Sequence, residues 1–416
     1  MPAAVRRRET CRLCDARDLT LVLSLGETPL ANAFVRPEQR GQPQPRFPLD
    51  VHVCLACGHA QLLDVVDPEL LFRDYVYVSA TSPVFVEHFR RYAETMRATA
   101  RLSRGSTVIE IGSNDGTMLR CFQDAGMRVL GIDPARAIAA AATAGGIETR
   151  PVFFDAALAR DLRRDGWEAA LITANNVFAH ADDLGGIADG VAHLLAPDGL
   201  FAFEVSYLLD VVDHVLFDTI YHEHLSYHTV KPLVGFFERH GLQLIEVQRV
   251  SPHGGSLRGI AQRRGGSRRV HPSVEAAIRE ETARGLHAPA AFRALAQRIG
   301  QIKIELTALL RERKAQGHRI AGFGAPAKAT TLLYHFGIGP ETLDYIVDDS
   351  PWKQGRYTPG HHIPVVPAAW LYDAAHRPDD VLVLAWNFAE SILRAHQAFH
   401  ASGGHFIIPL PQLEVR

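Results

Sequence analysis

What this sequence lacks excludes several classes of protein. None of its 416 residues belongs to an apolar run of the roughly 20 residues needed to span a bilayer. The net charge is −2, so no basic field attracts nucleic acid. No apolar signal core follows the arginines at 6–8. We expect these arginines to form a solvated terminus. We therefore expect a cytoplasmic, globular protein with neither a membrane nor a nucleic-acid partner.

Cysteine is scarce, with five residues, yet four of them form two close pairs. Cys11-x-x-Cys14 and Cys54-x-x-Cys57 have the spacing of tetrahedral zinc ligands. Thiols stay reduced in the cytoplasm, which favours a metal over disulfides; two redox pairs are the alternative. Four cysteines leave no open coordination position, so we expect a structural Zn²⁺ in a small domain at 1–75. The fifth, Cys121, is expected to be a packing thiol.

Beyond residue 75, apolar strands alternate with helices. After a helix expected at 83–100, we predict helices at 117–125 and 135–144 and strands at 107–111, 128–133, 169–173, 200–204, 242–250 and 256–262. This alternation predicts an α/β fold with a doubly wound sheet and helices on both faces, in a domain at 76–272.

A helical connection expected at 273–317 separates this domain from a second alternation. Here we predict a strand entering a glycine turn at 319–324, a helix at 328–335, and strands at 345–348, 381–385 and 405–409. The pattern indicates a smaller Rossmann-like α/β domain at 318–416.

The segment 110–116, Glu-Ile-Gly-Ser-Asn-Asp-Gly, lacks the third glycine of the dinucleotide fingerprint, which argues against an NAD-dependent enzyme. Gly112 and Gly116 still let the backbone approach a ligand closely. Asp133 ends the next strand, where a carboxylate can accept hydrogen bonds from both hydroxyls of a ribose. This pair of features suits an adenosine without a pyrophosphate, such as that of S-adenosylmethionine (SAM). An ordinary capped strand–turn–helix is the alternative.

Further residues are expected around this cofactor. Glu110 or Asp115 could neutralise the ammonium of its amino-acid end. Phe154 would lie near the adenine ring. Asn114 belongs to the loop itself, and Asn176, at the end of the strand at 169–173, would lie beside the ligand.

The densest polar stretch, 217–228, holds three histidines. A metalloprotease HExxH motif would need a histidine at position 226, which is serine. Because histidine titrates near neutrality, general acid–base work fits better, with a second metal or a polar helix terminus as alternatives. We expect His224 to be a base oriented by Glu223, and Tyr221 to donate to a developing oxyanion. His180 would lie at the mouth of the same cleft.

Together these residues resemble the SAM-dependent sugar C-methyltransferases of deoxysugar pathways, over essentially the whole chain. The matching segments are the four paired cysteines, 110–116, 221–224, 253–255, 322–328 and 353–360. The resemblance implies an N-terminal zinc-binding domain, a central SAM-binding domain and a C-terminal domain that helps to hold a nucleotide sugar. It implies methylation of a carbon α to the ketone of a dTDP-4-keto-deoxysugar, with C3 expected and C5 as the alternative.

The resemblance also implies roles for individual residues. Tyr221, Glu223 and His224 fall on the family's catalytic stretch, and His222 is a weaker candidate. Tyr75 and His180 fall on positions that line the active site, although Tyr77 could take the place of Tyr75. The residues expected near the nucleotide sugar are Tyr77, His253, Gly322, Gly324, Lys328 and Lys353.

The mechanism expected is proton removal by His224, with Tyr221 or His180 steadying the enolate oxygen. Zinc takes no chemical part. An O- or N-methyltransferase using SAM, and a zinc-ribbon nucleic-acid binder, are the rival classes. We expect a monomer that acts in antibiotic-sugar biosynthesis.

Overall fold

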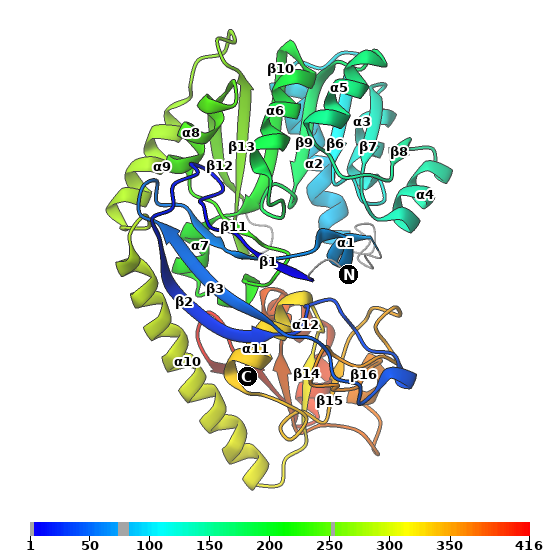
Figure 1. Ribbon diagram of the computed structural model, residues 1–416. Helices are drawn as coiled ribbons and strands as arrows, with labels where there is room; N and C mark the ends of the chain where they lie inside the picture. Colours follow the sequence, from blue (N-terminus) through cyan, green and yellow to red (C-terminus); the bar gives the residue numbers. More distant parts are fainter. Residues whose placement is uncertain (1–3, 74–82, 251–253) are drawn as a thin grey trace.

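The computed structural model describes residues 4–73, 83–250 and 254–416. A seven-stranded sheet forms the upper part of the molecule in Figure 1 and a six-stranded sheet the lower part, with strands β2 and β3 between them. In the described ranges, no helix is both long and apolar enough to cross a membrane.

The N-terminal sheet has the order β11-β4-β3-β2 and is antiparallel. Its strands are β2 (Leu19–Thr28), β3 (Phe47–Cys54), β4 (Ala60–Leu62) and β11 (Ser226–Tyr227). β11 comes from the middle of the chain and pairs Ser226 with Gln61. The end of the polar stretch at 217–228 therefore pairs with the small N-terminal sheet.

Short elements complete this region: β1 (Val5–Arg7), β5 (Asp64–Val66), η1 (Pro37–Gln39) and α1 (Pro68–Phe72). The arginine run in and after β1 is more than a solvated terminus, which corrects our expectation. Arg6 and Arg8 both form ion pairs with Asp182, and Arg7 pairs with Asp64 at 2.5 Å. The Arg8 side chain is only 18% exposed.

The central sheet confirms the doubly wound prediction, with order β12-β13-β10-β9-β6-β7-β8. Neighbours from β10 to β8 are parallel, while β13 runs antiparallel to both β10 and β12. The strands are β6 (Thr107–Ile111), β7 (Arg128–Ile132), β8 (Thr149–Arg150), β9 (Ala169–Asn175), β10 (Leu195–Ser206), β12 (Leu242–Val250) and β13 (Ser256–Arg263). The helices are α2 (Pro83–Thr99), α3 (Thr117–Asp124), α4 (Arg136–Ala144), α5 (Ala156–Arg164), α6 (Leu184–Leu194), α7 (Leu208–Asp213) and α8 (Val230–Arg239), with a 3₁₀ turn η3 (Phe217–Thr219).

Chain order reverses beside β6. The chain passes from β6 to β7 and β8 on one side, and then returns to β9 and β10 on the other. Ligands of open α/β sheets bind outside the carboxyl ends of the strands at such a switch point. The loop at Gly112 and the end of β9 at Asn175 therefore meet where a cofactor is expected.

The helical stretch expected at 273–316 is two helices, α9 (Pro272–Ala283) and α10 (Pro289–Ala315). Gly285, at φ +65°, lies in the break between them, where a residue without a Cβ avoids strain. α10 runs along one side of the molecule in Figure 1. Its buried residues recur at helical spacing, which produces one apolar face: Phe292, Leu295, Ile299, Ile302, Leu306 and Leu310.

The C-terminal sheet has the order β16-β15-β14-β17-β18-β19, parallel except for β19. Its strands are β14 (Ile320–Phe323), β15 (Tyr345–Val347), β16 (Val365–Val366), β17 (Asp380–Val383), β18 (His405–Ile408) and β19 (Glu414–Val415). The helices are α11 (Ala327–Phe336), α12 (Ala389–Ala395) and α13 (Gln397–Ala401), with 3₁₀ turns η5 (Ala368–Leu371) and η6 (Trp386–Phe388). One buried cluster joins this sheet to the N-terminal sheet and α10.

Candidate functional site

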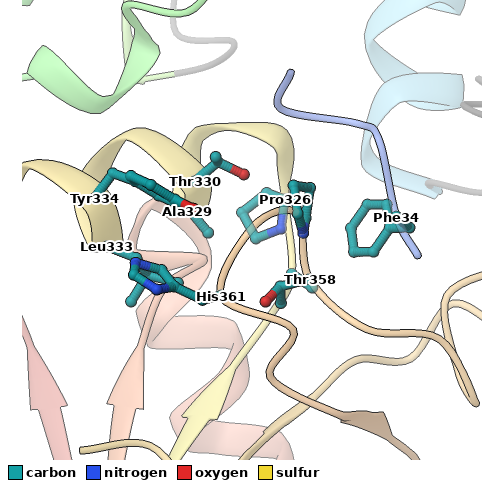
Figure 2. A pocket seen from close by; sticks show the side chains of 10 residues that line it. Phe34, Pro326, Ala329, Thr330, Leu333, Tyr334, Thr358 and His361 are labelled. Carbon is teal, nitrogen blue, oxygen red and sulfur yellow. The ribbon is translucent and has the colours of Figure 1, made fainter. Parts of the chain in front are cut away.

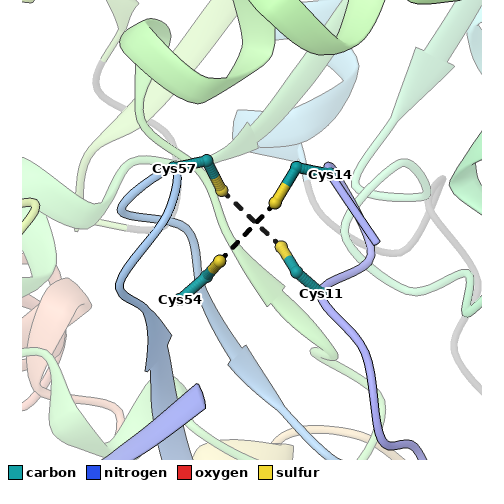
Figure 3. A group of neighbouring side chains, drawn as sticks. All are labelled: Cys11, Cys14, Cys54 and Cys57. Atoms are coloured by element: carbon teal, nitrogen blue, oxygen red, sulfur yellow. Dashed lines mark hydrogen bonds between the residues drawn. The ribbon is translucent and has the colours of Figure 1, made fainter. Parts of the chain in front are cut away.

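The four paired cysteines converge on one point (Figure 3). Their sulfurs all lie within 4.8 Å of one another, with Cys11–Cys57 at 3.6 Å and Cys14–Cys54 at 3.5 Å. A disulfide needs about 2.05 Å, so these are separate thiols. Zn–S bonds of about 2.3 Å place the sulfurs of a tetrahedron about 3.8 Å apart. The cluster therefore fits Zn²⁺, as the spacing predicts.

The electrostatics of the cluster agree with a bound cation. A hydrogen bond from Cys57 lowers the pKa of Cys11 to about 5, whereas burial raises the pKa of Cys14 to about 11. Four crowded thiols cannot all ionise without a neutralising charge, and a divalent cation supplies it. Cys121 lies elsewhere, on α3, with its thiol near the Thr117 carbonyl at 3.7 Å.

The glycine loop follows β6 directly. Gly112 has φ +70°, and a Cβ there would lie 2.1 Å from Cγ2 of Val177. Gly116, at φ +77°, is the N-cap of α3. Both positions require glycine, because the backbone is left-handed and a neighbouring side chain fills the space. The loop at 112–116 is thus packed against the segment that follows β9.

Asp133 holds this loop in place. Its carboxylate accepts hydrogen bonds from the N–H groups of Asn114 (2.8 Å) and Ala135 (2.9 Å). Burial raises the pKa of Asp133, although both hydrogen bonds oppose that shift. Each carboxylate oxygen has a second lone pair. The structure thus gives Asp133 a loop-holding role, and its contact with a ribose stays a prediction.

Glu110 is 3% exposed, and its Oε2 has no hydrogen-bond partner among the described residues. Burial raises the pKa of Glu110 well above its ordinary value. Oδ1 of Asn175, at the end of β9, likewise has no partner in the described ranges. Orphaned buried acceptors at the switch point fit a cationic ligand such as the ammonium group of SAM. Asp115 instead accepts from the Thr117 hydroxyl at 2.7 Å at the start of α3.

The two other cofactor candidates differ in their exposure. Asn176 is half-buried in a left-handed conformation, with φ +54°, beside the carboxyl end of β9. Phe154 is buried in the core, and its ring packs against Gly190 of α6. Its neighbour Phe153 is half-buried beneath the Arg73 guanidinium, 5.0 Å away. Phe153 therefore has the more accessible ring of this pair, and the contact of Phe154 with the adenine ring stays a prediction.

The polar stretch brings three of the predicted catalytic residues together. The rings of Tyr221 and His224 have centroids 4.1 Å apart, and those of His180 and His224 stack at 4.9 Å and 22°. Phe72 continues the stack beyond His180 at 5.8 Å. The segments are joined by the Leu225 N–H, which donates to the Ala179 carbonyl at 2.9 Å. His180 follows β9, so the stack lies beside the switch point.

A backbone carbonyl holds one nitrogen of the His224 ring. Its Nδ1 lies 2.7 Å from the Thr219 carbonyl, which can only accept, so Nδ1 carries a proton and donates this hydrogen bond. Glu223 is 3% exposed and accepts a hydrogen bond from the Asn32 amide at 2.6 Å. The Thr219 carbonyl thus holds Nδ1, and the role of Glu223 in orienting His224 stays a prediction.

The other histidines of the stretch are buried. Nε2 of His222 lies 3.1 Å from the Phe47 carbonyl, and that of His228 lies 3.4 Å from the Phe178 carbonyl. Burial lowers the pKa of each to about 4. Both rings anchor the segment between domains. Three predicted residues, Tyr75, Tyr77 and His253, lie outside the described residues.

The C-terminal domain repeats the loop–carboxylate arrangement. Asp348, just after β15, accepts from the N–H groups of Ala325 (2.7 Å) and Ser350 (2.8 Å), as Asp133 does in the central domain. Sequence reasoning missed Asp348, although an acidic residue after a short apolar strand was its signal. A Cβ on Gly324 would lie 2.5 Å from that of Ala385, and one on Gly322 would lie 2.9 Å from Ile346.

Both predicted lysines lie at this edge of the sheet, each engaged with protein groups. Nζ of Lys328 donates to Asn387 at 2.7 Å and lies 3.7 Å from the Trp386 ring centre. Burial lowers the pKa of Lys328 to about 8. Nζ of Lys353 donates to the Ala325 carbonyl at 2.9 Å and pairs with Asp348 at 3.5 Å.

Beside this edge, Phe34 faces the start of α11 across a small pocket (Figure 2). Thr330 and Tyr334 of α11 and His361 of a neighbouring loop also line it. Its volume of about 10 Å³ is room for about one water, so this pocket alone cannot hold a nucleotide.

Family models match three successive parts of the chain. A zinc binding domain matches residues 11–72, a methyltransferase domain matches 86–247, and a C-methyltransferase C-terminal domain matches 251–411. C-methyltransferase NovU of Streptomyces niveus is 36% identical over 417 residues, covering 100% of this chain and 98% of that protein.

Two solved structures overlap less than half of the chain. A SAM-dependent methyltransferase from Clostridium acetobutylicum ATCC 824 has TM-score 0.35 and 11% identity, covering 44% of this chain and 92% of its own. Magnesium protoporphyrin IX methyltransferase from Synechocystis PCC 6803 has TM-score 0.34 and 15% identity, covering 46% of this chain and 90% of its own.

Proposed function

Because this chain belongs to the C-methyltransferase family and uses SAM, we propose that its acceptor is a carbon α to the ketone of a dTDP-4-keto-deoxysugar. The C3 carbon is the proposed position. The observation that carries this proposal is the bond between His224 Nδ1 and the Thr219 carbonyl. It makes Nδ1 the donor, so that in the neutral imidazole Nε2 is the basic nitrogen beside two further polar rings, as the removal of a carbon-bound proton requires.

The steps performed by this chain are proton transfer and charge stabilisation. Nε2 of His224 takes the proton from the α carbon, and the electron pair moves onto the ketone oxygen as an enolate. The Tyr221 phenol or the stacked His180 donates a hydrogen bond to that oxygen, which lowers the energy of the developing charge. When bound, SAM supplies the electrophilic methyl group. The Glu110 carboxylate and the loop at 112–116 are proposed to bind its amino-acid end, and Asp133 its ribose.

Two lysines at the edge of the C-terminal sheet support the proposal of a nucleotide-linked substrate. Lys328 and Lys353 place two ammonium groups beside the turn at Gly324, which suits a diphosphate. Tyr77, His253 and Gly322 are the remaining candidates for binding the nucleotide sugar, and Tyr75 is a candidate for lining the active site.

His224→Asn tests the proposed base. In D₂O without SAM, the wild type should exchange the α proton of a dTDP-4-keto-deoxysugar, and the variant should lose most of that exchange, about 10²–10⁴-fold. His193→Asn is the matched control, because His193 is an exposed histidine on α6. Full exchange by His224→Asn would eliminate this base. Exchange absent from the wild type, with methyl transfer retained, would favour an O- or N-methyltransferase.

The position of transfer needs a separate measurement. SAM carrying a ¹³C-labelled methyl group would mark the product, and carbon–proton correlation spectra would place the label. Correlation of the methyl protons with C3 is the expected result. A methyl group on C5, or on oxygen or nitrogen, would replace this proposal with the corresponding alternative.

A further inference from the structure

Arg12 lies between the two cysteines of the first zinc knuckle, with its side chain fully buried. Its Nε donates to Oδ1 of Asp182 at 2.9 Å, and its Nη1 donates to the Leu225 carbonyl at 3.3 Å. Nη1 also donates to Oε1 of Gln61 at 3.1 Å and to the Leu62 carbonyl. One guanidinium therefore contacts the zinc-binding sheet and two distant segments of the chain.

Those two segments carry the stacked histidines. Asp182 lies two residues after His180, and Leu225 follows His224 directly. They cross where the N–H groups of Leu225 and Ser226 donate to the Ala179 carbonyl, at 2.9 and 3.1 Å. Arg12 bridges both sides of this crossing. A shift of the knuckle would therefore reach both histidine segments through Arg12, alongside the pairs of Arg6 and Arg8 with Asp182 and the bond from the Leu62 N–H to the Leu225 carbonyl.

Burying an arginine side chain costs free energy, because its charged group loses contact with water. Nε and Nη1 of Arg12 are paired, whereas its buried Nη2 has no partner among the described residues, and the planar guanidinium fork fixes the directions of the groups that Nε and Nη1 contact. Lysine, a flexible point charge, cannot reproduce that fork.

We propose that Arg12 is a positioning residue, which couples the zinc knuckle to the alignment of His180 and His224. The inference rests on the proposed function of these histidines. On this proposal, the zinc site affects the rate of turnover as well as the stability of the fold. Arg12 lies beside the zinc ligand Cys11 and contacts both histidine segments through Asp182 and the Leu225 carbonyl.

Arg12→Lys tests the proposal in the full-length, zinc-loaded protein, assayed well below its melting temperature. We expect zinc content and SAM affinity to equal those of the wild type. The kcat and the rate of α-proton exchange should fall about 10–100-fold while KM for the sugar changes little, because a misplacement of about 1 Å can lower rates 10²-fold. Arg7→Lys is the control, since this neighbouring arginine pairs with Asp64 instead.

Asp182→Asn removes the negative charge of the carboxylate that pairs with Arg12. The Asp182 side chain is 13% exposed. The substitution should also lower kcat, and the double variant should lose less than the product of the two single effects. If Arg12→Lys does not fold, the kcat of Asp182→Asn tests the proposal in its place. A zinc-loaded variant with wild-type kcat would overturn this inference alone. A wild type that neither exchanges the α proton nor methylates the sugar would defeat the proposed function and this inference with it.

Discussion

The indole N–H of Trp386 donates a hydrogen bond to Oδ2 of Asp218 at 2.6 Å, joining the C-terminal domain to the polar stretch at 217–228. Asp218 is fully buried, and it directly precedes Thr219, the residue that fixes His224. The Thr331 hydroxyl adds a second tie by donating to the Ile220 carbonyl at 2.7 Å. The segment is thus held by the zinc-binding sheet at its end and by the C-terminal domain at its start.

Removing the indole donor should destabilise the fold. Trp386→Phe leaves the Asp218 carboxyl buried without this bond, which we expect to lower the free energy of unfolding by about 1–3 kcal/mol. Urea denaturation measures the loss. Trp352→Phe is the control, because Trp352 is 64% exposed and should change stability by less than about 0.5 kcal/mol. Equal stability of the two variants would contradict this prediction.

Lys328 should give substrate binding a pH dependence. With its pKa near 8, the ammonium is lost as the pH rises through that value, so the KM of the nucleotide sugar should increase above about pH 8. Lys328→Met should raise KM about 10-fold or more at pH 7. Lys314→Met is the control, since Lys314 forms a surface pair with Asp344. A pH-independent KM and no effect of Lys328→Met would remove Lys328 from the binding site.

Loss of zinc should unfold the N-terminal region. Cys14→Ser removes one of four ligands, so we expect metal content, measured by mass spectrometry, to fall along with the melting temperature. Cys121→Ser should change neither quantity, because Cys121 lies on α3 away from the cluster. An unchanged melting temperature after complete removal of zinc by a chelator would refute a structural role.

Glu110 should make stability depend on pH in the absence of SAM. Its folded-state pKa lies above the unfolded value of 4.5, so the folded state binds more protons and stability falls as the pH rises from 4.5 to the folded pKa. The slope from this group approaches about 1.4 kcal/mol per pH unit. Glu110→Gln should flatten that slope in urea titrations between pH 5 and 8, and calorimetry should show weaker SAM binding. Identical slopes in both proteins would mean that Glu110 is ionised throughout.

The sequence could predict those parts of the site that are formed by residues close together in the chain. The two CxxC pairs gave the zinc cluster, because four ligands in two short turns carry their own geometry. The strand at 107–111, its glycine loop and Asp133 likewise came from contiguous patterns of burial and turn residues. His224 and Tyr221 were found as neighbours because only a short segment separates them.

The contacts missed by the sequence analysis join distant segments. Thr219 acts through a backbone carbonyl, which every residue possesses, so no side chain marks it. Asn32 reaches Glu223 across 191 positions. Phe154 and Phe153 were indistinguishable in sequence, since only packing against Gly190 decides which ring is buried.

The order of strands, loops and metal-binding turns was determined by the sequence itself, because each depends on a few adjacent residues and on their hydrophobic period. Tertiary structure decided which tautomer His224 adopts, that β11 joins the zinc-binding sheet, and that Arg12 reaches both histidine segments. These features arise when close packing brings distant backbone groups into hydrogen-bonding distance, and the types of the residues involved do not specify that outcome.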